Sequence, residues 1–384
     1  MIRATAALAL LATCSVAVAD GPRARELGVP FEGTPGALDA ITDVAGVTVG
    51  QVTLIEDLPG GRKVRTGVTA VLPRGRQSLD TPAYGAWFPL NGNGEMTGSA
   101  WLEESGQLEG PVMLTNTYSV GVVRDAVIAW RIRAGAADSS GYWWSLPVVA
   151  ETWDGDLNDI NGFHVRPEHA WQALDQAKGG QVVEGNVGGG TGMSCHEFKC
   201  GIGTSSRSTM VGDRKYMLGA LVQANYGTRE TLRIAGVPVG QDIPVSDSAN
   251  TAPPHGDSGS IIVVLATDAP LLPTQLKRVA KRASLALGRM GSFAGNGSGD
   301  MFIAFSTANA AAVNGGSFVQ LESLGNDYLD PLFIAAVQAT EEAIVNAMVA
   351  ARDMHGQDGH FTPALPHDRL VELLKRYGRY APPP

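Results

Sequence analysis

The stretch Gly259-Ser-Ile-Ile-Val-Val-Leu-Ala-Thr-Asp-Ala-Pro270 places a glycine and a serine directly before an unbroken apolar run. Such a run predicts a buried strand. A Gly-Ser bond at the start of that strand suits a chain that cuts itself and exposes Ser260 as a new N-terminus. The freed α-amine titrates near ~8 and accepts the proton of the serine hydroxyl, so Ser260 would carry its own base.

This arrangement is typical of N-terminal-nucleophile hydrolases, and two other interpretations of the loop stay open. Gly256-Asp-Ser-Gly259 looks like the sequence around the nucleophile of trypsin-like proteases, which would make Ser258 catalytic. Those enzymes need a His and an Asp from elsewhere on an all-β double barrel. This chain has predicted helices and lacks an Ala-Ala-His-Cys-like segment upstream. The third interpretation is a Gly/Ser/Pro loop that enters a core strand and has no chemistry.

Composition indicates a compact globular protein and argues against nucleic acid as a partner. Hydrophobic residues make up 44% of the 384 residues and charged residues 17%, which fits a large core rather than disorder. The 48 glycines indicate many tight turns and close backbone approaches. The formal charge is −9, and no basic run offers a surface for phosphates.

The N-terminus predicts secretion. Arg3 supplies a charged start, residues 6–12 an apolar core, and residues 17–19 a small-residue cleavage site before Asp20. The apolar part is too short to span a bilayer, and we expect no other span. We therefore expect residues 1–19 to be a signal peptide and the protein to be periplasmic or secreted. The context of Cys14 also resembles a lipoprotein signal, although a Thr before that Cys is unusual.

Two cysteines remain after signal removal, Cys195 and Cys200. They would close a small disulfide loop in an oxidising compartment. His196 between them suggests metal as an alternative, but no second Cys/His pair lies near in sequence. We expect no metal site and leave the disulfide open.

Hydrophobic periodicity predicts alternating strands and long helices without an interdomain linker. Such mixed sheets with helices packed outside them indicate a layered α/β/β/α sandwich. The predicted strands cover residues 47–55, 66–72, 112–116, 146–153, 217–225, 261–265 and 301–306. The predicted helices cover residues 120–134, 167–178, 274–288, 330–351 and 368–376.

Several motifs, in order, resemble one family. The Ser260 strand is followed by a basic helix that contains Lys277-Arg-Val-Ala-Lys-Arg282. The further motifs are Pro147-Val-Val-Ala-Glu-Thr-Trp-Asp154, Gly188-Gly-Gly-Thr-Gly192, Gly201-Ile-Gly-Thr-Ser-Ser-Arg207, Leu221-Val-Gln-Ala-Asn-Tyr-Gly227 and Ser298-Gly-Asp300. From about Gly46 to Arg376, the chain resembles the DmpA-like family of β-peptidyl aminopeptidases and L-aminopeptidase/D-esterases.

The resemblance implies an αββα sandwich of the N-terminal-nucleophile type and self-cleavage into two chains. The break would fall between Gly259 and Ser260, and would divide the single domain 20–384 into chains 20–259 and 260–384. It further implies a serine aminopeptidase that needs no cofactor and acts on small peptides or aminoacyl amides with a free N-terminal amino acid. It also implies a homo-oligomer of cleaved heterodimers.

The resemblance assigns Ser260 as nucleophile and Asn225 as oxyanion-hole donor, with a turn-capping role as the alternative for Asn225. Ser298 and Asp300 match a family Ser-x-Glu pair close to the nucleophile. Residues two apart on an extended segment point the same way, so both can face one site. Asp300 is one methylene shorter than Glu, which puts its direct contact with the Ser260 amine in doubt.

Three further positions match substrate-binding features of the family. Glu151 matches the acid that holds the substrate ammonium, and a surface ion pair is the alternative. Trp153 stands where some relatives have a tyrosine, and its indole can stack and donate but has no hydroxyl. Gly189 and Gly190 lack the Gly-Lys-Ser/Thr ending of a phosphate loop, and we expect them to form a glycine-rich wall near the substrate.

Two functions of other classes remain as alternatives. Ornithine acetyltransferases share the sandwich layout but use threonine as nucleophile, and both Ser260 and the signal peptide argue against them. A non-catalytic periplasmic binding or scaffold protein with the same fold would keep an uncut chain and an inert Ser260.

Overall fold

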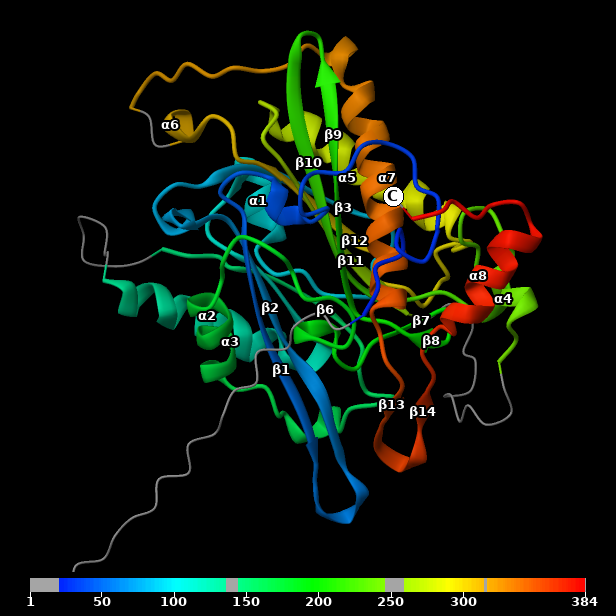
Figure 1. Cartoon of the computed structure of the whole chain (residues 1–384). Coiled ribbons are helices and arrows are strands. Elements are labelled where there is room, and N and C mark those ends of the chain that lie inside the picture. Colours follow the sequence, from blue (N-terminus) through cyan, green and yellow to red (C-terminus); the bar gives the residue numbers. More distant parts are fainter. Residues whose placement is uncertain (1–20, 136–143, 246–258, 314–315, 384) are drawn as a thin grey trace, which may run out of the picture.

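A computed structural model describes residues 21–135, 144–245, 259–313 and 316–383. Two β-sheets lie face to face at the centre, and helices cover both outer faces (Figure 1). This is the four-layer αββα sandwich predicted from the sequence. The helical layers exclude the all-β double barrel that the trypsin-like alternative requires, and Ser258 itself lies outside the described residues.

The smaller sheet has four strands in the order β1-β2-β5-β6. β1 and β2 form a long antiparallel hairpin, while β5 and β6 pair in parallel. Parallel neighbours need a crossover, which contains a helix here. The strands are β1 (Thr48–Asp57), β2 (Lys63–Arg76), β5 (Val112–Asn116) and β6 (Val148–Thr152).

The larger sheet has six strands in the order β4-β3-β12-β11-β10-β9. The strand that begins with Ser260, β11, lies between antiparallel β10 and parallel β12. The strands are β3 (Ala83–Pro89), β4 (Gln107–Leu108), β9 (Ile202–Val211), β10 (Arg214–Asn225), β11 (Ser260–Thr267) and β12 (Met301–Ser306). Ala83–Pro89 and Ile202–Val211 were not predicted as strands, whereas the other long strands agree with prediction to within a few residues.

The side chains of β11 explain why its sequence is an unbroken apolar run. Ile261, Val263 and Leu265 pack in the core under the outer helices. Ile262 and Val264 pack in the core between the two sheets. Since successive side chains point to opposite faces and both faces are covered, every position of this strand between Ser260 and Thr267 is apolar.

Four helices form most of the outer layers. α2 (Val120–Ala134) and α3 (Pro167–Asp175) pack on the smaller sheet. α5 (Pro273–Arg289) and α7 (Asp330–Val349) pack on the larger sheet (Figure 1). The remaining helices are α1 (Ser99–Ser105), α4 (Val239–Asp242), α6 (Ala310–Val313) and α8 (His367–Arg376).

α7 is the one helix of the described residues that is long and apolar enough to cross a membrane, with a mean hydropathy of 1.4. However, 83% of its apolar window is buried inside the protein. It lies against β9, β10 and α5. Its composition therefore reflects a central position in the core.

Two small hairpins complete the described fold. β7 (Ser194–Cys195) pairs with β8 (Phe198–Lys199), and a disulfide joins Cys195 to Cys200. This pairing answers the question that the sequence left open for the two cysteines. β13 (Met354–His355) pairs with β14 (Phe361–Thr362) after the end of α7.

Candidate active site

Ser260 begins β11 and lies opposite Asn225, which ends β10. The antiparallel register pairs these two residues directly, so they are neighbours at the same end of the two strands. Ser260 is buried, with 6% of its surface exposed. The structure thus brings the predicted nucleophile and the predicted oxyanion donor side by side.

One backbone N–H contacts two oxygen atoms next to the Gly259–Ser260 peptide bond. The N–H of Gly299 donates to Oγ of Ser260 (3.2 Å) and to the carbonyl oxygen of Gly259 (3.3 Å). A fixed donor in this position stabilises negative charge that develops on the carbonyl oxygen. A Cβ on Gly259 would lie 2.0 Å from the carbonyl oxygen of Asn225. Only glycine therefore fits where the loop meets β10.

Ser298 and Asp300 flank this backbone donor. Oγ of Ser298 donates to Oδ1 of Asp300 (2.7 Å), and the Asp300 N–H donates to Oδ1 of Asn91 (2.6 Å). Both predicted side chains are buried. Because Gly299 connects them and binds Ser260, the pair lies beside the nucleophile. The Asp300 carboxylate, one methylene shorter than that of a glutamate, accepts this hydrogen bond from Ser298.

The side-chain amide of Asn225 is held at both ends. Its Oδ1 accepts the backbone N–H of Ser194 (2.8 Å), and its Nδ2 donates to the carbonyl oxygen of Trp153 (2.8 Å). An N–H can only donate, so the Ser194 bond assigns the amide orientation. The amide nitrogen carries a second hydrogen, which is the one a substrate oxyanion would use. Both described bonds lead to other segments rather than to a turn after Asn225.

Glu151 lies near the end of β6 with its carboxylate buried, since only 3% of the residue is exposed. Burial of this kind does not fit the alternative of a surface ion pair. Oε1 accepts the N–H of Glu95 (2.9 Å), and Oε2 accepts the hydroxyl of Thr117. Burial raises the pKa of Glu151, while these two hydrogen bonds oppose the rise. The site therefore holds a desolvated carboxylate that gains from a cationic ligand.

Gly94 brings this carboxylate close to the segment that binds Ser260. A Cβ built on Gly94 would lie 3.2 Å from Oε1 of Glu151 and 3.4 Å from Cα of Gly299. The buried acid and the Gly299 segment therefore approach the same backbone position, which only a glycine can occupy without crowding them.

Exposed aromatic side chains lie near the Glu151 carboxylate. Tyr118 directly follows Thr117, the partner of Glu151, and its ring meets Trp153 edge-on with centroids 5.7 Å apart. Phe163 stacks on Tyr118 at 5.9 Å. Trp153 also supplies the carbonyl oxygen that Asn225 binds, so the aromatic group adjoins the predicted oxyanion donor.

Gly189 and Gly190 lie in a buried turn, Gly188–Gly190, between the sheets. A Cβ on Gly189 would lie 2.1 Å from Oε1 of Gln223, and one on Gly190 would lie 2.4 Å from the backbone nitrogen of Ile202. The glycines are thus required by close packing around β9 and β10. Their contact with substrate stays a prediction.

Sequence reasoning missed the residues that act through backbone atoms. Gly299 and Ser194 contribute only N–H groups, and residue type does not reveal such a role. The sequence did contain a signal for Thr117, because this residue directly follows the buried strand that ends at Asn116. Ends of neighbouring parallel strands meet at one edge, so β5 and β6 bring Thr117 to Glu151.

Comparison with known proteins shows the family of this chain. The sequence profile of Peptidase family S58 matches residues 39–362. The chain belongs to peptidase family S58. This match covers both sheets, the outer helices α2, α3, α5 and α7, and all the candidate site residues.

The S58 relatives cover almost the whole chain. The β-peptidyl aminopeptidases BapA of Sphingosinicella microcystinivorans and Sphingosinicella xenopeptidilytica are 53% and 47% identical, over 98% and 96% of this chain and 98% and 94% of theirs. The L-aminopeptidase D-Ala-esterase/amidase of Ochrobactrum anthropi, described as a variant of the Ntn-hydrolase fold, is 48% identical. Its structure superposes with a TM-score of 0.88 and covers 94% of this chain and 100% of its own. The predictions of the family, of the sandwich fold and of an aminopeptidase are confirmed.

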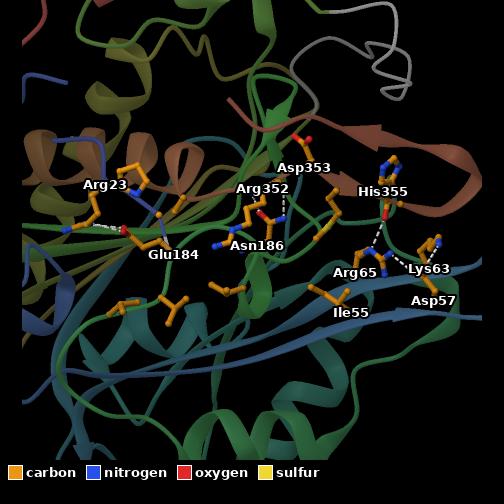
Figure 2. A pocket seen from close by; sticks show the side chains of 18 of the residues that line it. Arg23, Ile55, Asp57, Lys63, Arg65, Glu184, Asn186, Arg352, Asp353 and His355 are labelled. Atoms are coloured by element: carbon orange, nitrogen blue, oxygen red, sulfur yellow. Dashed lines mark hydrogen bonds and ion pairs between the residues drawn. The ribbon is translucent and has the colours of Figure 1, made fainter. Parts of the chain in front are cut away.

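A cavity of about 950 Å³ lies outside the candidate active site. It opens between the β1–β2 hairpin, the β13–β14 hairpin and the end of α7, and none of the candidate site residues lines it. Figure 2 shows Arg65 reaching both Asp57 on its own hairpin and His355 on the other.

Proposed function

We propose that this S58 peptidase activates itself by cutting the Gly259–Ser260 bond. Ser260 Oγ attacks the carbonyl carbon of Gly259, a C–O bond forms, and the C–N bond breaks as the hydroxyl proton passes to the leaving nitrogen. Water then hydrolyses the ester and leaves a Gly259 carboxylate and a free Ser260 amine. The observation that carries the proposal is the shared Gly299 N–H, which binds Oγ and the Gly259 carbonyl together.

The cleaved form would hydrolyse the bond after a free N-terminal α- or β-amino acid in peptides, amides or esters. Glu151 would bind the substrate ammonium, and Ser260 would attack with its own α-amine as proton acceptor. The second Nδ2 hydrogen of Asn225 would stabilise the oxyanion, an effect of about 2.7–4 kcal/mol for one donor. The proton then goes to the leaving amine, and water releases the amino acid from the acyl-enzyme.

Intact-mass analysis of the purified protein tests self-cleavage directly. The expected result is two chains, the smaller with the N-terminal sequence Ser-Ile-Ile-Val-Val. A single uncut chain that is inactive on aminoacyl anilides would instead support a binding or scaffold protein. Equal hydrolysis of an aminoacyl anilide and its N-acetylated form would contradict the role of the free amine.

We further propose that the protein is periplasmic or secreted after removal of residues 1–19, which lie outside the described residues. The buried Cys195–Cys200 disulfide supports an oxidising compartment. Shortly after the predicted cleavage site the chain is bound to the rest of the protein, because Arg23 donates to Glu184 (2.9 Å) and to the carbonyl oxygen of Thr204 (2.7 Å). The same mass measurement would show a large chain that begins at Asp20.

A homo-oligomer is the corresponding proposal for assembly. Phe318 is 98% exposed, and Val319 and Leu321 beside it are also exposed. Exposed apolar side chains that cluster in this way are typical of protein interfaces. Analytical ultracentrifugation of the wild type and of Phe318→Asp tests whether this segment contributes to assembly.

A further inference from the structure

The orientation of the Asn225 amide depends on a small hairpin, Ser194–Lys199, that does not contact the reacting bond. The N–H of Ser194 donates to Oδ1 of Asn225. The NH2 group of Asn225 therefore lies at the other end of the amide, where it donates to the carbonyl oxygen of Trp153. β7 and β8 make up this hairpin, with Ser194 paired to Lys199 and Cys195 paired to Phe198. A shift of the hairpin would therefore move the one donor that holds Oδ1.

The base of the hairpin is closed by two devices. The disulfide joins Cys195 to Cys200 with their Cα atoms 5.4 Å apart. The amine of Lys199 is buried and donates to the carbonyl oxygens of Met193 and Cys200, the residues on either side of the hairpin, the latter at 2.8 Å. Burial lowers the pKa of Lys199 well below its usual range, and Asp154 opposes this shift. Either form of the amine has the two hydrogens that these bonds need.

The turn of the hairpin is attached to the chain that follows Asn225. The N–H of His196 donates to the carbonyl oxygen of Tyr226 (2.7 Å). Arg229 donates to the carbonyl oxygens of His196 (2.8 Å) and Glu197 (2.5 Å). The guanidinium of Arg229 also lies over the Phe198 ring at 3.2 Å. The hairpin is thus held at its base, at its turn and on one face, and it presents one N–H to Asn225.

We propose that Lys199 is a positioning residue that, with the Cys195–Cys200 disulfide, locks this hairpin so that Asn225 presents its amide hydrogen to the oxyanion. The inference rests on the proposed oxyanion role of Asn225. Buried lysines are rare in protein cores because desolvation of the amine is costly. A hydrocarbon side chain would fill the same space, so the amine is explained by the two carbonyl groups that it binds.

The test is a double-mutant cycle between Lys199→Met and Asn225→Ala. Turnover of an aminoacyl anilide is counted per cleaved chain, with the cleaved fraction read from intact mass. Lys199→Met should lower kcat about 10- to 100-fold with little change in KM, since misplacement by ~1 Å has effects of this size. In the Asn225→Ala background the same change should have almost no further effect. The double variant Cys195→Ala/Cys200→Ala should show the same pattern.

Lys215→Met provides the matched control, because Lys215 is exposed at the opposite end of β10 and should leave kcat unchanged. Wild-type kcat in Lys199→Met would overturn the inference. So would a loss that multiplies in full with that of Asn225→Ala, because Lys199 would then act by another route. If Asn225→Ala itself kept full turnover, the proposed oxyanion role would fail and the inference with it.

Discussion

The site around Ser260 and the cavity between the two projecting hairpins differ in almost every physical respect. The cavity has a volume of about 950 Å³. Ion pairs with exposed partners line it, such as Lys63 with Asp57 (2.5 Å). The Ser260 site has buried polar side chains and a backbone donor, the Gly299 N–H, held beside the start of β11. Exposed ion pairs contribute little energy in water, whereas fixed donors in a desolvated site stabilise developing charge strongly. The proposed chemistry at Ser260 therefore relies on preorganised donors rather than on the volume of a cavity.

The largest expected effect separates the two serines of the loop. Ser260→Ala should give a single uncut chain without activity, because both the attacking oxygen and the new N-terminal nucleophile are lost. Ser258→Ala is the matched control and should still cleave and retain at least part of the activity. Intact mass and anilide hydrolysis measure both. A cleaved, active Ser260→Ala protein would remove the reason to prefer the Ser260 site over the cavity.

The second prediction concerns the amide donor. Asn225→Ala should lower kcat by about 10²- to 10³-fold with the fold intact, as expected for loss of one oxyanion donor. Self-cleavage should slow as well if the same group serves both reactions. Steady-state kinetics per cleaved chain, with circular dichroism as the fold control, gives the answer, and wild-type kcat would assign Asn225 to a purely structural role.

The third prediction concerns the buried acid. A charge-assisted hydrogen bond contributes about 1.5–3 kcal/mol, so Glu151→Gln should lower kcat/KM about 10- to 150-fold. Because burial raises the pKa of Glu151, wild-type ammonium binding should weaken on the acid side at a higher pH than for an exposed glutamate. The comparison uses an aminoacyl anilide at several pH values. Unchanged kcat/KM in the variant would contradict the assignment.

The fourth prediction concerns Asp154, the buried residue next to Trp153. Burial raises its pKa to about 7, while hydrogen bonds from Thr66 and Asn158 oppose the rise. Between the unfolded value of ~3.9 and this value, the folded protein holds a proton that the unfolded chain has lost. The contribution of Asp154 to stability is therefore fully present below about pH 4 and is lost as pH rises through about 7.

Asp154→Asn should remove this dependence. The free energy of unfolding of the variant, relative to wild type, should rise with pH by on the order of 1 kcal/mol per pH unit and level off above about pH 7. Urea unfolding at a series of pH values measures it. A difference that stays flat with pH would show that Asp154 is ionised like an ordinary surface carboxylate.

The smallest expected effect lies in the cavity. Arg352 is an exposed cavity residue, and Arg352→Ala should change kcat/KM by less than about twofold, as for an ordinary surface substitution. Figure 2 shows its position beside Asn186. A loss above about tenfold would break the comparison, because the cavity would then belong to the substrate path.

The sequence by itself determined the layers and pointed to the candidate nucleophile. Buried strands and amphipathic helices have periodic patterns that reflect burial directly, so β5, β11, β12 and the outer helices were predictable. The Gly-Ser bond before an apolar strand indicated Ser260, and the family motifs indicated Asn225, Glu151, Ser298 and Asp300. Ile202–Val211 escaped because it consists mostly of small and polar residues, including the buried Arg207. Ala83–Pro89 escaped because it is short and contains a glycine and a proline.

Only the tertiary structure decided which groups meet. The Gly299 N–H reaches Ser260 because β12 runs parallel to β11, and residue type carries no trace of a backbone donor. Residues 193–200 fold into a hairpin at the end of β10. This hairpin brings Cys195 to Cys200 and the Lys199 amine to the carbonyl oxygen of Cys200. A sequence specifies burial through local patterns, whereas contacts between distant strand ends depend on register and sheet order, which emerge only when the whole core packs.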